Sequence, residues 1–62
     1  MFILTVLDFE DGLVYQYHIE TDKEMLEAED FENIMCDQGH RLDDCEWMSH
    51  SDGRINMQKI EL

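Results

Sequence analysis

The sequence predicts a small α+β domain with the element order β-β-α-β-β, in which a four-stranded antiparallel sheet carries one helix on one face. Two Asp-Gly dipeptides lie between extended runs and indicate two hairpins, and the segment between the hairpins has helical periodicity. With 62 residues, the chain is expected to form a single domain over residues 1–62.

The first hairpin is predicted from "FILTVLDFEDGLVYQYHIE", two β-branched and aromatic runs joined through Asp11-Gly12. This dipeptide suits a type I′ turn, whose two central positions need positive φ. A two-residue turn pairs Leu4 with Ile19 and Val6 with Tyr17. The side chains expected to meet the helix are Phe2, Leu4, Val6, Tyr15, Tyr17 and Ile19.

The opposite face of this hairpin is more apolar than a solvated face needs to be. It carries Ile3, Thr5, Leu7, Phe9, Val14, Gln16 and His18. Because one helix cannot cover both faces, we expect Ile3, Leu7, Phe9 and Val14 to form a homodimer or partner interface. The alternative is that these residues are scattered on the surface or covered by the C-terminal segment.

The helix is expected to begin at Thr21, since Glu24 follows three residues later and the two form a capping box. Gly39 can take the left-handed conformation that ends a helix, here after about residue 37. The predicted buried stripe consists of Met25, Ala28, Phe31, Met35 and Cys36.

The second hairpin is predicted around Asp52-Gly53. If these are the two loop residues, Glu46 faces Lys59 and Cys45 faces Ile60. A three-residue loop would instead move every partner by one.

Four metal-ligand types occur in the order Cys36, His40, Cys45, His50, which raises the question of a zinc site. The spacing argues against one, because Cys45 and His50 would point to opposite faces of a strand. We therefore expect this stretch to pack as a strand, and we expect no metal and no cofactor.

A catalytic cysteine is also disfavoured. Asp43, Asp44 and Glu46 surround Cys45, and their negative charge would raise the pKa of its thiol. The sequence has no glycine-rich phosphate loop, and a domain this small has little room for a deep pocket. The sequence thus predicts a protein that is not an enzyme.

The charge balance is strongly acidic, with 16 Asp and Glu against 4 Lys and Arg and a net charge of -12. Such a surface repels nucleic acid and anionic membranes and attracts basic protein surfaces. We expect no direct nucleic-acid binding and no membrane association. The apolar opening "MFILTVL" is too short for a span and lacks the features of a signal peptide, so the expected location is the cytoplasm.

The acids are concentrated in and beside the predicted helix and in the segment that follows it. Carboxylates on a rigid surface can imitate nucleic-acid phosphates and occupy a basic cleft. The residues expected to bind a protein partner with a basic surface are Glu27, Glu29, Asp30, Asp37, Asp43 and Asp44.

The short acidic chain, its "DG" hairpin, its acidic helix ending at "GH" and its "CEWMSH" strand resemble the small acidic early proteins of tailed bacteriophages. The resemblance implies a non-enzymatic inhibitor or modulator of a host nucleic-acid-binding or defence protein, acting as a nucleic-acid mimic in the host cytoplasm. The alternatives are a homo-oligomeric structural or regulatory subunit that uses the exposed sheet face, and a zinc-stabilised module.

Overall fold

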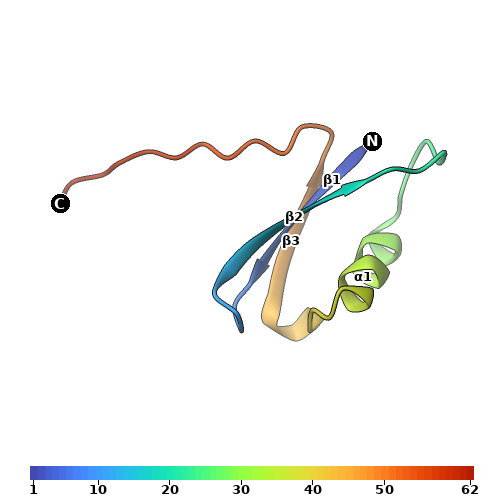
Figure 1. The fold of residues 1–62 in the computed structure, drawn as a ribbon, viewed down its shortest axis with the longest axis horizontal. Helices are drawn as coiled ribbons and strands as arrows, with labels where there is room; N and C mark the ends of the chain where they lie inside the picture. Colours follow the sequence, from blue (N-terminus) through green and yellow to red (C-terminus); the bar gives the residue numbers. More distant parts are fainter.

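The computed structural model describes all 62 residues and contains a three-stranded antiparallel sheet with one helix on one face (Figure 1). The elements are β1 (Phe2–Asp8), β2 (Leu13–Ile19), α1 (Ala28–Asp37), the 3₁₀ helix η1 (Leu42–Asp44) and β3 (Cys45–His50). The strand order is β2-β1-β3, so β1 is the central strand. The fold is a small α+β domain, but the predicted four-stranded sheet is wrong.

The missing strand is the one expected after Asp52-Gly53. The carboxylate of Asp52 accepts a hydrogen bond from Arg54 Nε at 2.7 Å, and the Gly53 carbonyl accepts one from Gln16 Nε2 at 2.8 Å. Gly53 also lies so close to Ile3 that a Cβ atom there would stand 2.3 Å from Ile3 Cγ2. The chain therefore crosses the sheet at Ile3 instead of reversing, and residues 54–62 project away as an extended segment, here named the C-terminal arm (Figure 1).

The first hairpin is present, but its predicted register is wrong by two residues. Leu4 pairs with Tyr17 and Val6 with Tyr15, and the loop comprises residues 9–12. The Asp8 carboxylate closes this wider loop, because its Oδ1 accepts the backbone N–H groups of Glu10 and Asp11, each at 3.0 Å. A shift by an even number of residues leaves each side chain on its predicted face.

Helix α1 begins later than predicted, at Ala28 rather than near Thr21. The carboxylate of Asp30 accepts the Glu27 backbone N–H at 2.9 Å, which satisfies a donor at the helix start. Thr21 Oγ1 instead accepts the N–H of Lys23 within the preceding irregular segment.

The end of the helix is as predicted. Helix α1 ends at Asp37, and Gly39 has a φ of 91°, in the left-handed region that favours glycine. The turn lets the His40 N–H donate to the Met35 carbonyl at 3.0 Å, so the chain returns toward the sheet.

The core between sheet and helix is small. Its buried members are Leu4, Val6, Phe31, Met35 and Cys45. Aromatic rings extend it, because Phe31 lies 5.3 Å from Trp47 and 6.2 Å from Phe2 between ring centroids. Three residues of the predicted helical stripe, Met25, Ala28 and Cys36, are exposed instead.

We predict that deleting residues 54–62 leaves the free energy of unfolding unchanged to within about 0.5 kcal/mol, because the arm adds no strand and no buried side chain. Urea unfolding followed by Trp47 fluorescence measures this. Leu4→Ala in the fully buried core is the positive control and should cost about 2 to 5 kcal/mol. A comparable loss in the deletion variant would mean that the arm pairs with the sheet in solution.

Candidate functional site

A cluster of hydrogen-bonded polar side chains lies inside the small core. His40 Nδ1 is 2.6 Å from Asp8 Oδ2, and His40 Nε2 is 2.5 Å from the Tyr17 hydroxyl. Asp8 and His40 are only 6% and 7% exposed, and they are the two buried residues with charged or polar side chains. The cluster joins the end of β1, the middle of β2 and the turn after α1.

Cys45 completes this buried polar cluster of Asp8, Tyr17, His40 and Cys45. It pairs directly with Asp8 across β1 and β3, and donor atoms of Asp8, His40 and Cys45 all lie within 4.8 Å of one another. The four residues considered for zinc from the sequence do not all come together, because Cys36 and His50 are exposed. His40 and Cys45 do meet, with Asp8 as the neighbour that the sequence analysis missed.

One sequence signal could have identified Asp8. Phe2, Leu4 and Val6 alternate toward the helix side, and the same period puts Asp8 on that side. A carboxylate on a core-facing position needs a buried partner, because burying a charge without one is costly. The pattern therefore demands a partner for Asp8, although it does not say that the partner is His40.

The electrostatics of the cluster keep Asp8 ionised and Cys45 protonated. The hydrogen bond from His40 is the main cause that lowers the pKa of Asp8 below its usual 3.8. The ionised carboxylate therefore stabilises the folded protein above pH 3.8, and this contribution is lost as the pH falls through the lowered pKa. Burial, followed by the charge of Asp8, raises the pKa of Cys45 above 9.0. Burial also raises the pKa of Tyr17 above 10.0. A protonated, buried thiol is a poor nucleophile.

The acidic helix surface comprises Glu27, Glu29, Asp30, Asp37, Asp43 and Asp44. Four of them are exposed: Glu27 at the start of α1, Glu29 and Asp37 within α1, and Asp43 in η1. Asp30 and Asp44 are only half-buried, and each has a local partner. Asp30 binds the Glu27 N–H and lies 3.9 Å from Lys23 Nζ, and Asp44 lies 3.6 Å from Arg41 Nε.

All four cationic side chains are already next to a carboxylate. The pairs are Lys23–Asp30, Arg41–Asp44, Arg54–Asp52 and Lys59–Glu61. No cation therefore remains to neutralise Glu27, Glu29, Asp37 and Asp43, which present uncompensated negative charge to solvent.

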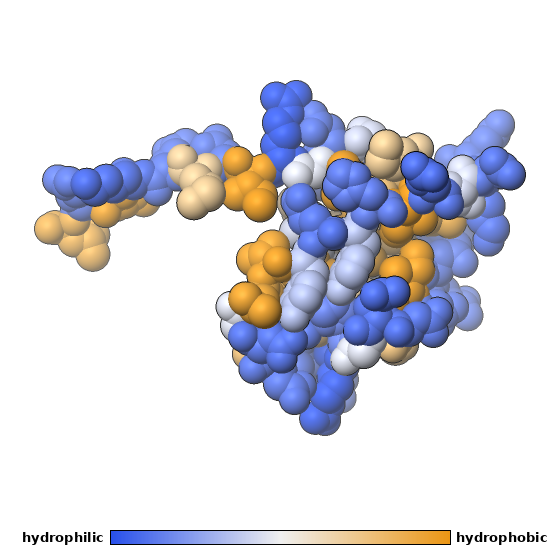
Figure 2. Space-filling model, in the orientation of Figure 1, coloured by the Kyte–Doolittle hydropathy of each residue, from blue (hydrophilic) through white to orange (hydrophobic).

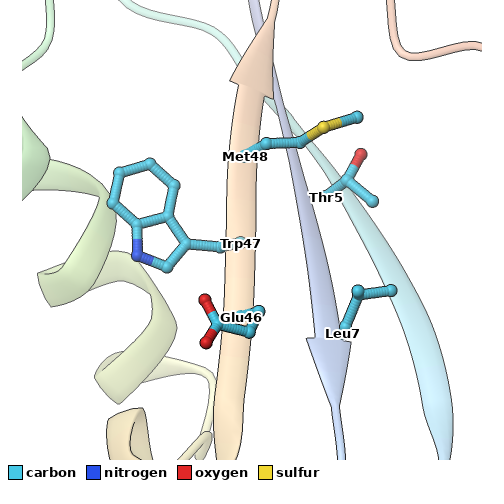
Figure 3. Close-up of a pocket in the computed structure, with 5 residues that line it drawn as sticks. All are labelled: Thr5, Leu7, Glu46, Trp47 and Met48. Carbon is cyan, nitrogen blue, oxygen red and sulfur yellow. The ribbon is translucent and has the colours of Figure 1, made fainter.

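The outer sheet face, which points away from the helix, is only partly covered. Ile3 is half-buried beside Gly53, whereas Leu7, Phe9 and Val14 are 42%, 63% and 55% exposed. Met48, on the neighbouring strand β3, is also exposed and points to the same side as Thr5 and Leu7, opposite to Trp47 (Figure 3). The sequence did not place Met48 on this face, because its position follows from the pairing of Thr5 with Met48 between distant strands. Figure 2 shows apolar atoms exposed on the side of the sheet away from the helix.

Two shallow hollows meet at Leu7 on this face. One has a volume of about 160 Å³ and is lined by Thr5, Leu7, Glu46, Trp47 and Met48 (Figure 3). The other, of about 250 Å³, is lined by Leu7, Asp8, Phe9, Gly12, Leu13 and Val14. Leu7 is thus the central residue of the exposed apolar surface.

Comparisons with protein-family models, curated proteins and solved structures find no match to this chain. Neither helix has the length and apolar composition that a membrane crossing requires. The function has to be inferred from the chain's own residues.

We predict that Tyr17→Phe destabilises the fold by about 1 to 3 kcal/mol, because it leaves His40 Nε2 buried without its hydrogen-bond partner. The matched control is Tyr15→Phe. The Tyr15 hydroxyl donates to the exposed Asp11 carboxylate at 2.9 Å, and water can replace this hydrogen bond when the hydroxyl is removed. Urea unfolding of both variants measures the difference. Equal losses of unfolding free energy in the two variants would show that the buried Tyr17–His40 hydrogen bond does not stabilise the fold more than an exposed one.

Proposed function

We propose that this protein is a non-enzymatic binding protein whose acidic helix surface docks onto the basic surface of a protein partner that binds nucleic acid. The observation that carries the proposal is that every cation is already paired while Glu27, Glu29, Asp37 and Asp43 stay exposed on and beside one helix. A row of fixed carboxylates imitates the phosphates that such a partner binds.

The way these carboxylates are held supports a binding role. Glu29 and Asp37 belong to α1, whose other side packs Phe31 and Met35 into the core, so the backbone under them is anchored. A charged group on an anchored helix loses less conformational entropy on binding than one on a free segment. The net charge of -12 would also steer a basic partner toward the protein and speed association at low salt.

The partner class follows from the same charge pattern together with the resemblance to phage early proteins. A host nucleic-acid-binding or defence protein offers the clustered Lys and Arg that the acidic helix surface needs. In this proposal the protein blocks that cleft as a nucleic-acid mimic and does not bind nucleic acid itself.

We predict that the triple variant Glu29→Lys, Asp37→Lys, Asp43→Lys loses capture of a basic partner from a bacterial lysate and slows association by about tenfold or more. Fold stability should change little, because the favourable charge lost at the start of α1 is offset by the one gained near its end. Pull-down and stopped-flow association at low and high salt measure these effects.

The matched control is Glu10→Lys, Glu20→Lys, Glu61→Lys, which makes the same change in net charge at exposed positions away from the helix. This control should retain capture. Equal loss in both triple variants would mean that only total charge matters. A captured partner without a basic surface would contradict the proposal.

A second candidate function is self-association through the outer sheet face, as expected of a homo-oligomeric structural or regulatory subunit. The specific observation in its favour is the exposed apolar surface around Leu7, which spans two adjacent hollows. The C-terminal arm begins beside this face and exposes Ile55, Met57, Ile60 and Leu62. Figure 2 shows apolar patches separated by polar residues along the arm. A second copy could cover both surfaces.

If the protein self-associates in this way, Leu7→Lys should abolish the dimer, since a charge buried in an apolar interface costs several kcal/mol. Leu7 is exposed in the monomer, so the variant should fold. Asn33→Lys adds the same charge on the exposed side of α1 and should still dimerise. Light scattering over a range of protein concentrations measures the molar mass of each protein. A wild-type protein that stays monomeric at every concentration would eliminate this candidate.

A further inference from the structure

The buried polar cluster has a composition that hydrogen bonding alone does not require. Only 7 of 62 residues are buried, and three of them, Asp8, His40 and Cys45, have side chains of the kinds that bind metal ions. Their donor atoms converge within 4.8 Å of one another, although residues 8, 40 and 45 come from different elements.

The three side chains offer one carboxylate oxygen, one imidazole nitrogen and one sulfur atom. Zinc binds all three donor types at about 2.0 to 2.3 Å, whereas calcium and magnesium prefer oxygen donors alone. Those bond lengths in a tetrahedral arrangement place neighbouring donors roughly 3.3 to 3.7 Å apart. Asp8 Oδ2 and His40 Nδ1 now lie 2.6 Å apart, so they need to separate by only about 1 Å to admit an ion.

The groups that hold metal ligands in place are already present around this cluster. Asp8 Oδ1 accepts the N–H groups of Glu10 and Asp11, which leaves Oδ2 directed at His40. The Tyr17 hydroxyl lies 2.5 Å from His40 Nε2 and can accept a hydrogen bond from the Nε2–H group when Nδ1 binds the ion. Such outer contacts fix the orientation and tautomer of a ligating imidazole.

A bound metal ion would stabilise a domain as small as this one. A 62-residue chain with a five-residue buried apolar cluster is close to the limit at which a core stabilises a fold unaided, and natural domains of this size often add a structural ion. Ion binding would release the Cys45 thiol proton and replace the Asp8–His40 hydrogen bond with two coordination bonds.

We propose that Asp8, His40 and Cys45 form a binding site for zinc or a similar divalent transition-metal ion, with Tyr17 as the residue that positions the imidazole. The fourth coordination position is left to a water molecule. The three ligands are buried, whereas Glu29, Asp37 and Leu7 are exposed, so the metal site does not depend on the proposed binding function.

The test is a titration of the reduced, metal-free, full-length protein with Co²⁺, which reports on its ligands spectroscopically. The expected result is binding of one ion per chain with a thiolate-to-cobalt charge-transfer band in the near ultraviolet. Added Zn²⁺ should abolish the band, and Zn²⁺ should raise the melting temperature of the protein.

The chain contains its own control for the thiolate. Cys45→Ser should lose the charge-transfer band, whereas Cys36→Ser, which changes the exposed cysteine, should keep it. Tyr17→Phe should retain the band but weaken ion affinity about 10- to 100-fold, as expected for the loss of a group that orients a ligand. Circular dichroism verifies that each variant is folded.

The absence of a charge-transfer band in the wild-type protein overturns the proposal, and this result does not depend on whether any variant folds. A band that disappears with Cys36→Ser but survives Cys45→Ser also overturns it, because the ion would then be bound at the surface.

Discussion

The carboxylate of Asp8 is the group on which the arrangement of the chain depends. Its Oδ1 closes the β1–β2 loop by accepting two backbone N–H groups, and its Oδ2 binds His40 in the turn after α1. Asp8 also pairs with Cys45 at the start of β3, and the next residue, Phe9, donates its N–H to the Asp44 carbonyl at 2.9 Å. The Asp8 side chain therefore joins the hairpin loop to the turn after the helix, and the backbone at residues 8 and 9 adds the third strand.

A polar centre of this kind is unusual in so small a core, and the end of the helix explains how it is formed. Gly39, with a φ of 91°, turns the chain so that His40 points inward beside Tyr15 and Tyr17, with ring centroids 4.7 and 5.7 Å away. The imidazole thus fills space that an apolar side chain would otherwise occupy, and both of its nitrogens have partners. No buried side-chain nitrogen or oxygen lacks a hydrogen bond, so the burial cost of these groups is offset.

Local sequence signals predicted the parts of the fold that local interactions determine. The first hairpin, its two faces and the helix end near Gly39 follow from alternation and glycine geometry. The hairpin register was wrong because Asp8 closes a wider loop than Asp11-Gly12 suggests. The helix start was wrong because Thr21 binds Lys23 locally while Asp30 supplies the capping carboxylate for Glu27.

The errors in the second half of the chain have a non-local cause. β3 pairs with the central strand β1, as in Val6↔Trp47, and Gly53 then lies against Ile3 with its carbonyl bound by Gln16, so the chain does not turn back along the free edge of β3. The same contact brings Cys45 opposite Asp8, and no spacing rule links residue 8 to residues 40 and 45. The buried polar cluster was therefore not predictable beyond the signal that Asp8, on a core-facing position, needs a partner.

The two candidate binding surfaces lie on opposite sides of the sheet, so their responses to salt distinguish them. Glu29 and Asp37 belong to the helix, whereas Leu7 and its strand partner Val14 are on the outer side of the sheet (Figure 3). Association with a basic partner weakens as salt screens opposite charges. Two copies that each carry a charge of -12 repel one another, so salt would strengthen a contact between outer sheet faces. The sign of the salt effect therefore indicates which surface is used, before any interface residue is mutated.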